Sequence, residues 1–248
     1  MAVKEICSLT DLLKHLKADL NSALGPVWFR GHSDFTWKLS STFDRLKKPP
    51  AEIYLLNKFR QNANLLLNTQ IPKNDFDWLF LMQHYGVPTR LLDWTESPLI
   101  ALFFAIEIDN KKTMKNDGAL WLLYPYQLNN NSTANEKNYI PAFEEEDYLG
   151  SYTIDKYSKG KDKGIQPIAA IATRNNPRIQ AQLGTFTISH REKKPIEEVG
   201  DKKHIIKYKI PSKAKASIQT ELELLGLNKF QLFPELSSIG EIIKKELK

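Results

Sequence analysis

The amino-acid sequence predicts an α+β fold: a single domain with a mixed or antiparallel sheet at its core, flanked by helices. Four segments with helical spacing of apolar residues precede residue 110, and four strand-like segments follow it. The chain also has no internal repeat, no low-complexity tract and no clean linker. We therefore expect residues 1–248 to form one unit.

The first part of the chain predicts helices separated by a short strand. Ser8 and Asp11 resemble a capping box, and leucines follow at helical spacing, so an N-terminal helix is expected within residues 1–25. Residues 27–29 are apolar and aromatic and predict a short buried strand, whereas residues 51–67 have one apolar helical face.

The middle of the chain predicts two helices joined by an extended segment. Residues 76–85 form an apolar helix that stops at a glycine, and residues 87–90 must be extended because a residue before proline avoids the α region. Ser97 precedes Pro98 as an N-cap precedes a first-turn proline. The helix expected over residues 99–108 is apolar all round and is therefore predicted to be buried.

The second half alternates strands with a polar segment and ends in helices. Residues 127–163 are rich in Asn, Lys, Glu and Tyr without clear period, so they are expected to run over the surface. The strands are predicted at residues 119–124, 165–172, 184–190 and 204–210, and the helices at 213–225 and 235–247.

Composition limits the class of protein. No apolar run approaches the roughly 20 residues of a membrane-spanning helix, and the N-terminus lacks the apolar region of a signal peptide, so no membrane and a cytoplasmic location are expected. The single cysteine, Cys7, excludes an intramolecular disulfide and a multi-thiolate metal site. The net charge of +6 lies mainly in residues 156–163, 191–194 and 202–215. Such a surface attracts polyanions, including nucleic acid, or is simply solvated.

Several common catalytic motifs are absent. The sequence has no G-x-x-x-x-G-K-S/T loop, no G-x-G-x-x-G, no G-x-S-x-G and no H-E-x-x-H. The five histidines show no metal-ligand spacing, and no clustered carboxylates suggest a two-metal nuclease. No metal site is therefore predicted.

Arg30 and Gly31 follow a predicted buried strand directly. An arginine in that position is costly to bury unless it meets a carboxylate, a group of carbonyls or a phosphate. The structural alternative is an internal pair of Arg30 with Asp93 or Asp44, and the functional alternative is a bound phosphate. Gly31 permits a close backbone approach.

Arg90 and Asp93 present the same choice, because apolar residues separate them and place the segment inside. They either pair with each other or face a ligand. The free amides that follow Ser97 form an anion site at a helix start, where a phosphate can lie. His84 and Tyr85 can stack on a base or ribose, or form a plain aromatic pair in the core.

A third polar segment occupies residues 176–186. Arg178 follows a turn there, and Gln180, Gln182 and Gly184 would share one face if the segment were a strand. Glutamine can hydrogen-bond a ribose or an amide. The alternative is a polar strand face in solvent.

These segments together resemble the FRG domain, a family of bacterial and phage-associated proteins named for a Phe/Tyr-Arg-Gly motif. The resemblance covers about residues 20–247 and implies a lone FRG-type domain. It rests on Phe29-Arg30-Gly31, the HYG-x-PTRLLDWT-x-SP core within residues 83–105, Asp117–Trp121, residues 176–186 and residues 232–236.

The order of these motifs is also similar to that of ADP-ribosyltransferases. The comparison implies an ADP-ribosyltransferase-like fold, NAD as the cofactor and a nucleotide pocket. Under it, Arg30 and Arg90 hold the pyrophosphate, and His84 or Tyr85 contacts the nicotinamide ribose. The residues then expected to act in catalysis are Arg30, His84, Arg90, Asp93 and Gln182, and those expected to bind nucleotide are Arg30, Gly31, Ser41, Thr42, Tyr85, Thr89, Arg90, Ser97 and Arg178.

One departure from that pattern leaves alternatives open. The glutamate expected near the late strand is replaced by Gln182. Either Gln182 keeps only the ribose contact, or Asp93, Glu96 or Glu235 takes the role, or the protein has no transferase activity.

Two functions from different classes follow. The first is an NAD-using ADP-ribosyltransferase-like toxin or phage-defence effector that modifies protein or nucleic acid. The second is a non-catalytic module that binds a nucleotide or nucleic acid, and a nuclease-type effector is less favoured. The sequence sets no oligomeric state.

Overall fold

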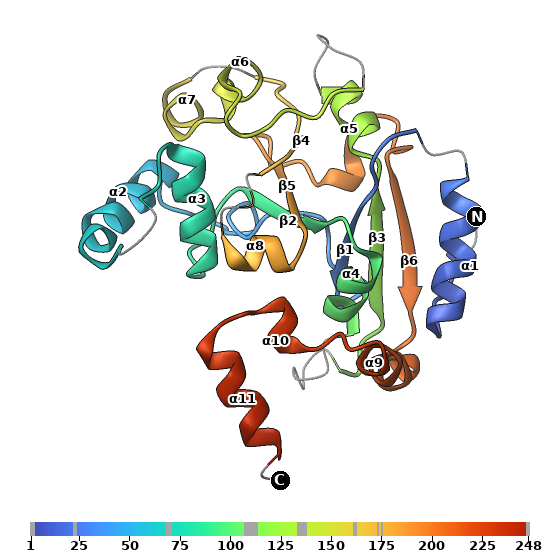
Figure 1. Cartoon of the computed structure of the whole chain (residues 1–248). Helices are drawn as coiled ribbons and strands as arrows, with labels where there is room; N and C mark the ends of the chain where they lie inside the picture. The colour runs from blue at the N-terminus through green and yellow to red at the C-terminus, as the bar shows by residue number, and fades with distance from the viewer. Residues whose placement is uncertain are drawn as a thin grey trace.

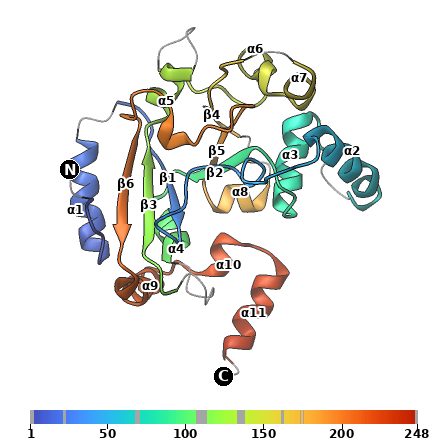
Figure 2. The same ribbon diagram turned by 180° about the vertical axis from the view of Figure 1, so that it is seen from behind.

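The computed structural model describes residues 3–21, 24–67, 71–106, 114–132, 138–160, 163–172, 174 and 176–246. Within these residues, six strands form one sheet in the order β4-β5-β2-β1-β3-β6, and each neighbouring pair is antiparallel. Helices surround this sheet (Figures 1 and 2). The predicted α+β class with an antiparallel core is thus confirmed.

The sheet consists of two well-paired halves with a weak seam between them. β1 (Trp28–His32) pairs with β3 (Gly118–Leu123) at five positions, and β2 (Leu91–Thr95) pairs with β5 (Gly184–Ile188) at five. β1 and β2 pair only at Phe29 and Thr95. The two strands therefore diverge beyond that pair, and side chains can occupy the space where a ladder would otherwise continue.

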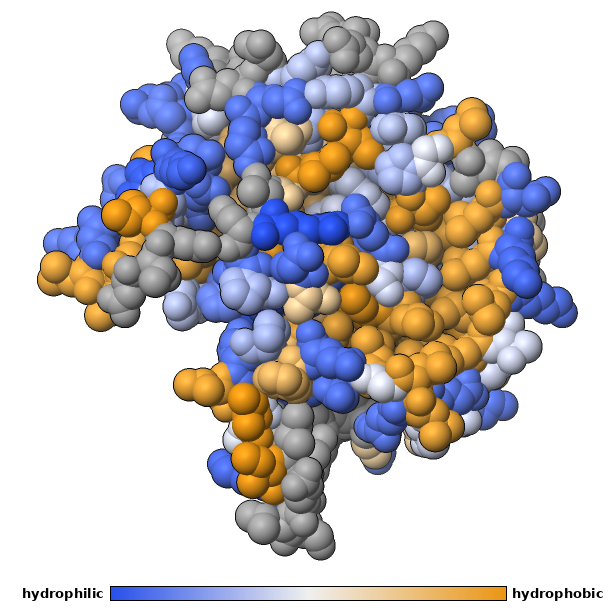
Figure 3. Space-filling view, viewed as in Figure 1, coloured by the Kyte–Doolittle hydropathy of each residue, from blue (hydrophilic) through white to orange (hydrophobic). Residues whose placement is uncertain are grey.

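The half of the sheet that contains β1, β3 and β6 (Ile205–Ile210) carries one apolar core. Helices α1 (Leu9–Leu20), α4 (Pro98–Ile106) and α9 (Lys215–Leu224) bury apolar side chains against these strands. The Ser8 hydroxyl accepts from the Asp11 backbone N–H at 3.2 Å and caps α1, as the sequence predicts. Figure 3 shows apolar side chains gathered on the surface between α4 and α1.

The other half, with β2, β5 and β4 (Ile168–Ala170), packs against a second group of helices. These are α2 (Glu52–Ala63), α3 (Asp75–His84), α6 (Glu146–Leu149) and α7 (Ile154–Lys159). Leu149 and Ile154 are fully buried in that core. Residues 127–163 are therefore not a surface excursion throughout, because amphipathic turns of this segment cover β4 and β5.

The remaining apolar cluster joins both halves of the sheet. Trp28, Trp94 and Trp121 lie in it, with Leu128 of α5 (Pro125–Ser132). Short 3-10 helices lie between the other elements at Asn64–Leu66, Gly150–Tyr152, Ile196–Glu198 and Ser212–Ala214.

The structure differs from the sequence expectations, or adds to them, at three places. The strand expected over residues 27–29 extends to His32, so Arg30 lies in its interior and not at its end. Residues 91–95 form a strand that the apolar pattern alone did not assign. Gln180 and Gln182 are not on a strand, because α8 (Pro177–Ala181) occupies that segment and Gln182 is its C-cap.

The last two helices differ in how they meet the rest of the molecule. α10 (Lys229–Leu232) approaches the body, and α11 (Leu236–Glu246) then projects away from it (Figure 1). Apolar side chains on α11 are exposed, with Leu236 87% exposed. Across the described parts of the chain, no helix is both long and apolar enough to cross a membrane.

Candidate functional site

A pocket of about 370 Å³ opens where β1 and β2 diverge. Its walls come from β1, β2 and β5, from the end of α3, from α4 and α8, and from the loop that follows β1. This volume lies within the range of pockets that bind small molecules. The pocket brings together segments that are more than 150 residues apart in the sequence, from Phe29 to Phe186.

Arg30 and Asp93 meet at the seam of the sheet. Continuing the Phe29–Thr95 register by two residues would pair Gly31 with Asp93, but the ladder stops before that position. Instead, Arg30 Nη1 donates to the Asp93 carbonyl oxygen at 2.5 Å and lies 3.7 Å from the Asp93 carboxylate. The internal pair of Arg30 with Asp93 that the sequence left open is therefore formed. It still leaves the Asp93 side chain 56% exposed to the pocket.

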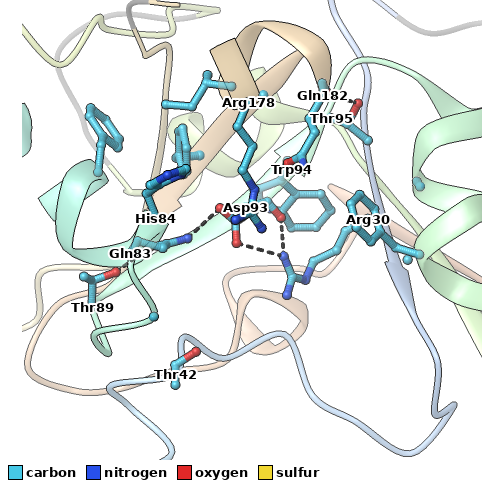
Figure 4. Close-up of a pocket in the computed structure, with 18 of the residues that line it drawn as sticks. Arg30, Thr42, Gln83, His84, Thr89, Asp93, Trp94, Thr95, Arg178 and Gln182 are labelled. Atoms are coloured by element: carbon cyan, nitrogen blue, oxygen red, sulfur yellow. Dashed lines mark hydrogen bonds and ion pairs between the residues drawn. The ribbon is translucent and has the colours of Figure 1, made fainter. Parts of the chain in front are cut away.

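The Asp93 carboxylate is oriented by a short chain of hydrogen bonds. Gln83 Nε2 donates to Asp93 Oδ1 at 2.5 Å, and the Thr89 hydroxyl donates to Gln83 Oε1 at 2.5 Å. Because Thr89 occupies the amide oxygen, the amide NH₂ must face Asp93. Figure 4 shows Gln83, Arg30 and Arg178 converging on Asp93 from three different elements.

Arg178 is a cation of the pocket whose guanidinium has no polar partner among the residues that the structure describes. It lies in the first turn of α8, where its backbone N–H donates to the Asn176 side chain. Its guanidinium stands 4.7 Å from the ring centre of Phe233. Among the described residues, that side chain makes no hydrogen bond and no ion pair. Five N–H donors of Arg178 therefore remain for a ligand.

Two histidines in the pocket are held in the neutral form. Burial, followed by the charge of Arg30, lowers the pKa of His32 to about 2, and its Nε2 accepts from Arg30 Nε at 3.0 Å. Burial and the nearby charge of Arg178 also lower the pKa of His84, while Glu235 opposes that shift. At neutral pH both rings add polarity without adding positive charge.

Arg90 does not line the pocket, contrary to the expectation that it binds a ligand. Its side chain is fully buried, and Arg90 Nε donates to Glu52 Oε2 at 2.7 Å. Its other nitrogens donate to the carbonyl oxygens of Ser189 and Tyr152, and the Tyr157 ring covers the guanidinium at 3.8 Å. Each of the three guanidinium nitrogens of Arg90 thus has a hydrogen-bond partner inside the protein, so Arg90 acts as a structural residue. The alternative pair of Arg90 with Asp93 is not formed.

Three further expected ligand residues also lie outside the pocket lining. Ser41 is buried and donates to Asp44 Oδ2 at 2.8 Å. Tyr85 is 67% exposed and packs edge-on against His84. Ser97 Oγ accepts from the Ile100 backbone N–H at 3.4 Å and so caps α4, which confirms its structural role.

The other expected residues do line the pocket: Arg30, Gly31, Thr42, His84, Thr89, Asp93, Arg178 and Gln182. Two of them have evident structural duties. A Cβ at Gly31 would overlap the carbonyl oxygen of Ala101 in α4. Gln182 Nε2 donates to the Leu232 carbonyl oxygen at 3.0 Å.

Sequence reasoning missed several residues of the pocket wall. Gln83, His32 and Trp37 line it, as does Arg45, which donates to the Thr42 hydroxyl at 3.3 Å. The spacing of Thr42 and Arg45, three residues apart, was a local signal for that contact. The Gln83–Asp93 bond carried no such signal, because it depends on how α3 packs beside β2.

Comparison with known proteins supports the family resemblance. Residues 25–114 match the FRG domain, and we therefore assign this region to the FRG domain family. No curated protein and no solved structure matches the chain. The matched region includes Arg30, Gln83 and Asp93, whereas Arg178 and Gln182 lie outside it.

Proposed function

We propose that the pocket binds a phosphorylated nucleotide, with NAD as the ligand, and that the protein is an ADP-ribosyltransferase-like enzyme. The observation that carries this proposal is Arg178. Its guanidinium reaches into the pocket without a hydrogen bond or ion pair to any described residue. A charged arginine left in this state in a protein pocket is best satisfied by an anionic ligand.

The three arginines that line the pocket differ in how many N–H donors they have available for phosphate oxygens. Arg178 and Arg45 keep most of their donors available, since Arg45 is exposed and uses one contact, to Thr42. Arg30 already donates to Asp93 and His32, so its charge stabilises the pocket more than it binds ligand. We therefore assign the pyrophosphate to Arg178 and Arg45.

Asp93 is suited to the ribose and to the reaction. Of the three carboxylates that could replace the missing glutamate, Asp93 lines the pocket, whereas Glu96 pairs with Arg174 and neither Glu96 nor Glu235 lines it. A carboxylate held by Gln83 can accept a hydrogen bond from a ribose hydroxyl and stabilise the positive charge that develops on the sugar. Phe80, Phe104 and Phe186 supply an apolar wall that strengthens this interaction.

The chemical step is a transfer of the ADP-ribosyl group. The bond between ribose and nicotinamide breaks, and its electron pair leaves with nicotinamide, which departs neutral. A nucleophile on a protein or nucleic acid then bonds to the same ribose carbon, and its proton moves to Asp93. A toxin or a phage-defence effector is the biological role that fits this chemistry.

The test measures binding and turnover separately. Arg178→Ala is expected to weaken NAD binding at least about 10-fold, because a charge-assisted contact worth about 1.4 kcal/mol or more is lost. Asp93→Asn is expected to change binding less than about 3-fold and to lower nicotinamide release at least about 100-fold. Titration calorimetry and release of label from NAD in the presence of a cell lysate provide the two readouts.

Arg174→Ala is the matched control, because Arg174 is ion-paired with Glu96 and does not line the pocket. The Arg174→Ala variant should bind NAD with the same affinity as the unsubstituted protein. If the unsubstituted protein binds neither NAD nor inorganic pyrophosphate, the proposal is wrong. If it binds NAD without releasing nicotinamide or transferring label, the transferase activity is excluded, and a second candidate function, binding of a nucleotide without catalysis, is supported.

That second candidate is a non-catalytic nucleotide-binding module. It is favoured by Gln182, which stands where the comparison expects a glutamate but has no carboxylate, and one of whose amide N–H groups donates to the Leu232 carbonyl oxygen. Nucleic acid has less support as its ligand, because two cations of the lysine-rich segment 202–215 are used internally. Lys209 pairs with Glu5 and Asp117, and Lys207 donates to the Phe35 carbonyl oxygen.

A further inference from the structure

The segment that joins α10 to α11 packs directly on pocket residues. The Leu232 carbonyl oxygen accepts from Gln182 Nε2, and the Phe233 ring lies against the Arg178 guanidinium. Figures 1 and 2 both place α10 beside α8 and close to α4. Elements from the C-terminal end of the chain thus contact α8, the helix that carries the unpaired cation.

The Phe233 ring is fixed from two sides. Its centre lies 4.7 Å from the Arg178 guanidinium carbon, and it meets Phe104 of α4 edge-on, with ring centres 5.9 Å apart at 83°. α4 is anchored by Ala101 and Ala105, which are fully buried. The stacking position of Phe233 is therefore set by the core of the protein and not by the short helix α10 alone.

Arg178 depends on that contact for its orientation. α8 has five residues, and Arg178 has no polar partner among the described residues that would hold its long side chain. A guanidinium stacked on a ring is restricted in rotation, yet its N–H groups point outward in the plane and stay available. Phe233 therefore orders Arg178 without occupying its donors.

We propose that Phe233 is a positioning residue that holds the Arg178 guanidinium in the pocket. The anion site is then complete only when residues 228–235, which include Phe233, are docked on α8 and α4. This inference rests on the proposed function, because it names the element that controls the same pocket. When the segment is docked, Arg178 is ordered toward Asp93 and an anion binds. When it is displaced, Arg178 is free to leave, and affinity for an anion falls.

Thermodynamic linkage makes the effect reciprocal. If docking of the segment favours the anion, the anion must favour docking of the segment by the same factor. The ligand therefore stabilises residues 228–235 although these residues do not line the pocket. A purely structural C-terminal segment would show no such response.

The experiment titrates the full-length protein with NAD and with inorganic pyrophosphate by calorimetry. Phe233→Ala is expected to weaken binding of both probes by about 3- to 30-fold, the range of one cation–π contact. Phe233→Leu keeps apolar bulk without the aromatic face and should lose nearly as much, whereas Phe233→Tyr should stay within about 2-fold. Phe230→Ala is the matched control, since Phe230 lies in α10, the helix whose C-cap is Phe233, and makes no ring or cation contact among the described residues.

A double-mutant cycle tests the mechanism. In an Arg178→Ala background, Phe233→Ala should have no further effect on affinity, because the group that it positions is absent. An equal loss in both backgrounds, or equal losses for Phe233→Ala and Phe230→Ala, would overturn the inference. Thermal unfolding of each variant shows whether a loss of affinity is caused by unfolding of the protein.

Hydrogen exchange separates failure of this inference from failure of the proposed function. Pyrophosphate or NAD should slow amide exchange in residues 228–235 of the unsubstituted protein, and unchanged exchange with ligand bound would overturn the inference alone. If neither probe binds, the proposed function fails. Amide exchange measured without ligand then tests whether the contact between Arg178 and Phe233 stabilises residues 228–235. Faster exchange in Arg178→Ala than in Arg174→Ala would then retain the positioning contact, and equal rates would overturn it.

Discussion

Two arginines separated by 88 residues show how environment decides the role of a side chain. Arg90 is fully buried and uses Glu52 and two carbonyl oxygens as partners. The Arg178 side chain makes no hydrogen bond or ion pair within the described part of the chain, and its guanidinium lies over the Phe233 ring. The first residue stabilises the fold, and the second is available to a ligand.

Replacing Arg90 is therefore expected to unfold the protein before it affects ligand binding. Arg90→Ala should lower the free energy of unfolding by about 3–5 kcal/mol, because Glu52 would remain as an unpaired buried charge. Urea denaturation monitored by tryptophan fluorescence measures this loss. Lys203→Ala, which removes an exposed pair with Asp201, is the control and should cost at most about 1 kcal/mol. A stable Arg90→Ala protein that no longer binds NAD would contradict the structural role.

At the scale of elements, the pocket exists because β1 stays paired with β3 and separates from β2. α4 supports β1 at the seam, where the backbone of Gly31 lies against the backbone of Ala101 and Ala105. This close approach fixes the direction of β1 and with it the positions of Arg30 and His32. The glycine of the family motif thus has a packing function in addition to its place in the pocket wall.

The close contact between β1 and α4 predicts a large effect of a single methyl group. A Cβ at Gly31 would overlap the carbonyl oxygen of Ala101 and lie 2.5 Å from the backbone nitrogen of Ala105. Neither backbone atom can move without shifting α4, so Gly31→Ala should cost about 1–3 kcal/mol or more. For a chain of this size, the melting temperature should fall by at least about 2–4 °C per kcal/mol.

Gly150→Ala is the matched control for this substitution. A Cβ at Gly150 meets no atom within 4 Å, so the melting temperature should stay unchanged or rise slightly. Equal melting temperatures for the two variants would show that β1 and α4 are not in close contact.

At the scale of the whole molecule, the region that matches the FRG domain does not contain the complete sheet. β1 and β2 lie within residues 25–114, but their main partners, β3 and β5, lie outside. Arg178, Gln182 and Phe233 also come from outside the matched region. The pocket is thus a property of the longer chain.

An isolated fragment of residues 25–114 is therefore expected not to fold. Its two strands would pair at one position only, and apolar side chains such as Leu122 and Phe186 would be missing from the cores. Two-dimensional NMR should show narrow amide dispersion for the fragment and wide dispersion for the full chain. A fragment with native dispersion and pyrophosphate affinity would contradict this account of the pocket.

Local signals predicted many of the elements well. The Ser8 cap, the Ser97 cap of α4 and the turn at Gly86, with φ of 76°, are contacts or conformations within a few residues. The alternation of Ile206, Tyr208 and Ile210 likewise predicted β6 and its buried face. Such features are readable because their physical causes lie within one turn or one strand.

Predictions that depended on distant neighbours were less successful. No element is predicted from the sequence for residues 177–181, where Gln180 and Gln182 are considered only as one face of a possible strand, although the Asn176 cap and Pro177 favour a helix start. β2 was not assigned, because its paired strand, β5, is almost 100 residues away. Residues 127–163 are rich in polar residues, yet Leu149, Tyr152 and Ile154 are buried against strands that they meet only after folding.

The sequence by itself determined the α+β class, the family of residues 25–114 and the position of the longer helices, because caps, turns and apolar periods act over short distances. It also named Arg30, Asp93, Arg178 and Gln182, which the folded chain brings to one pocket. Only the tertiary structure decided which arginine is satisfied and which is free. That difference depends on Glu52 lying beside Arg90 and Phe233 beside Arg178, and both are contacts between residues far apart in the chain.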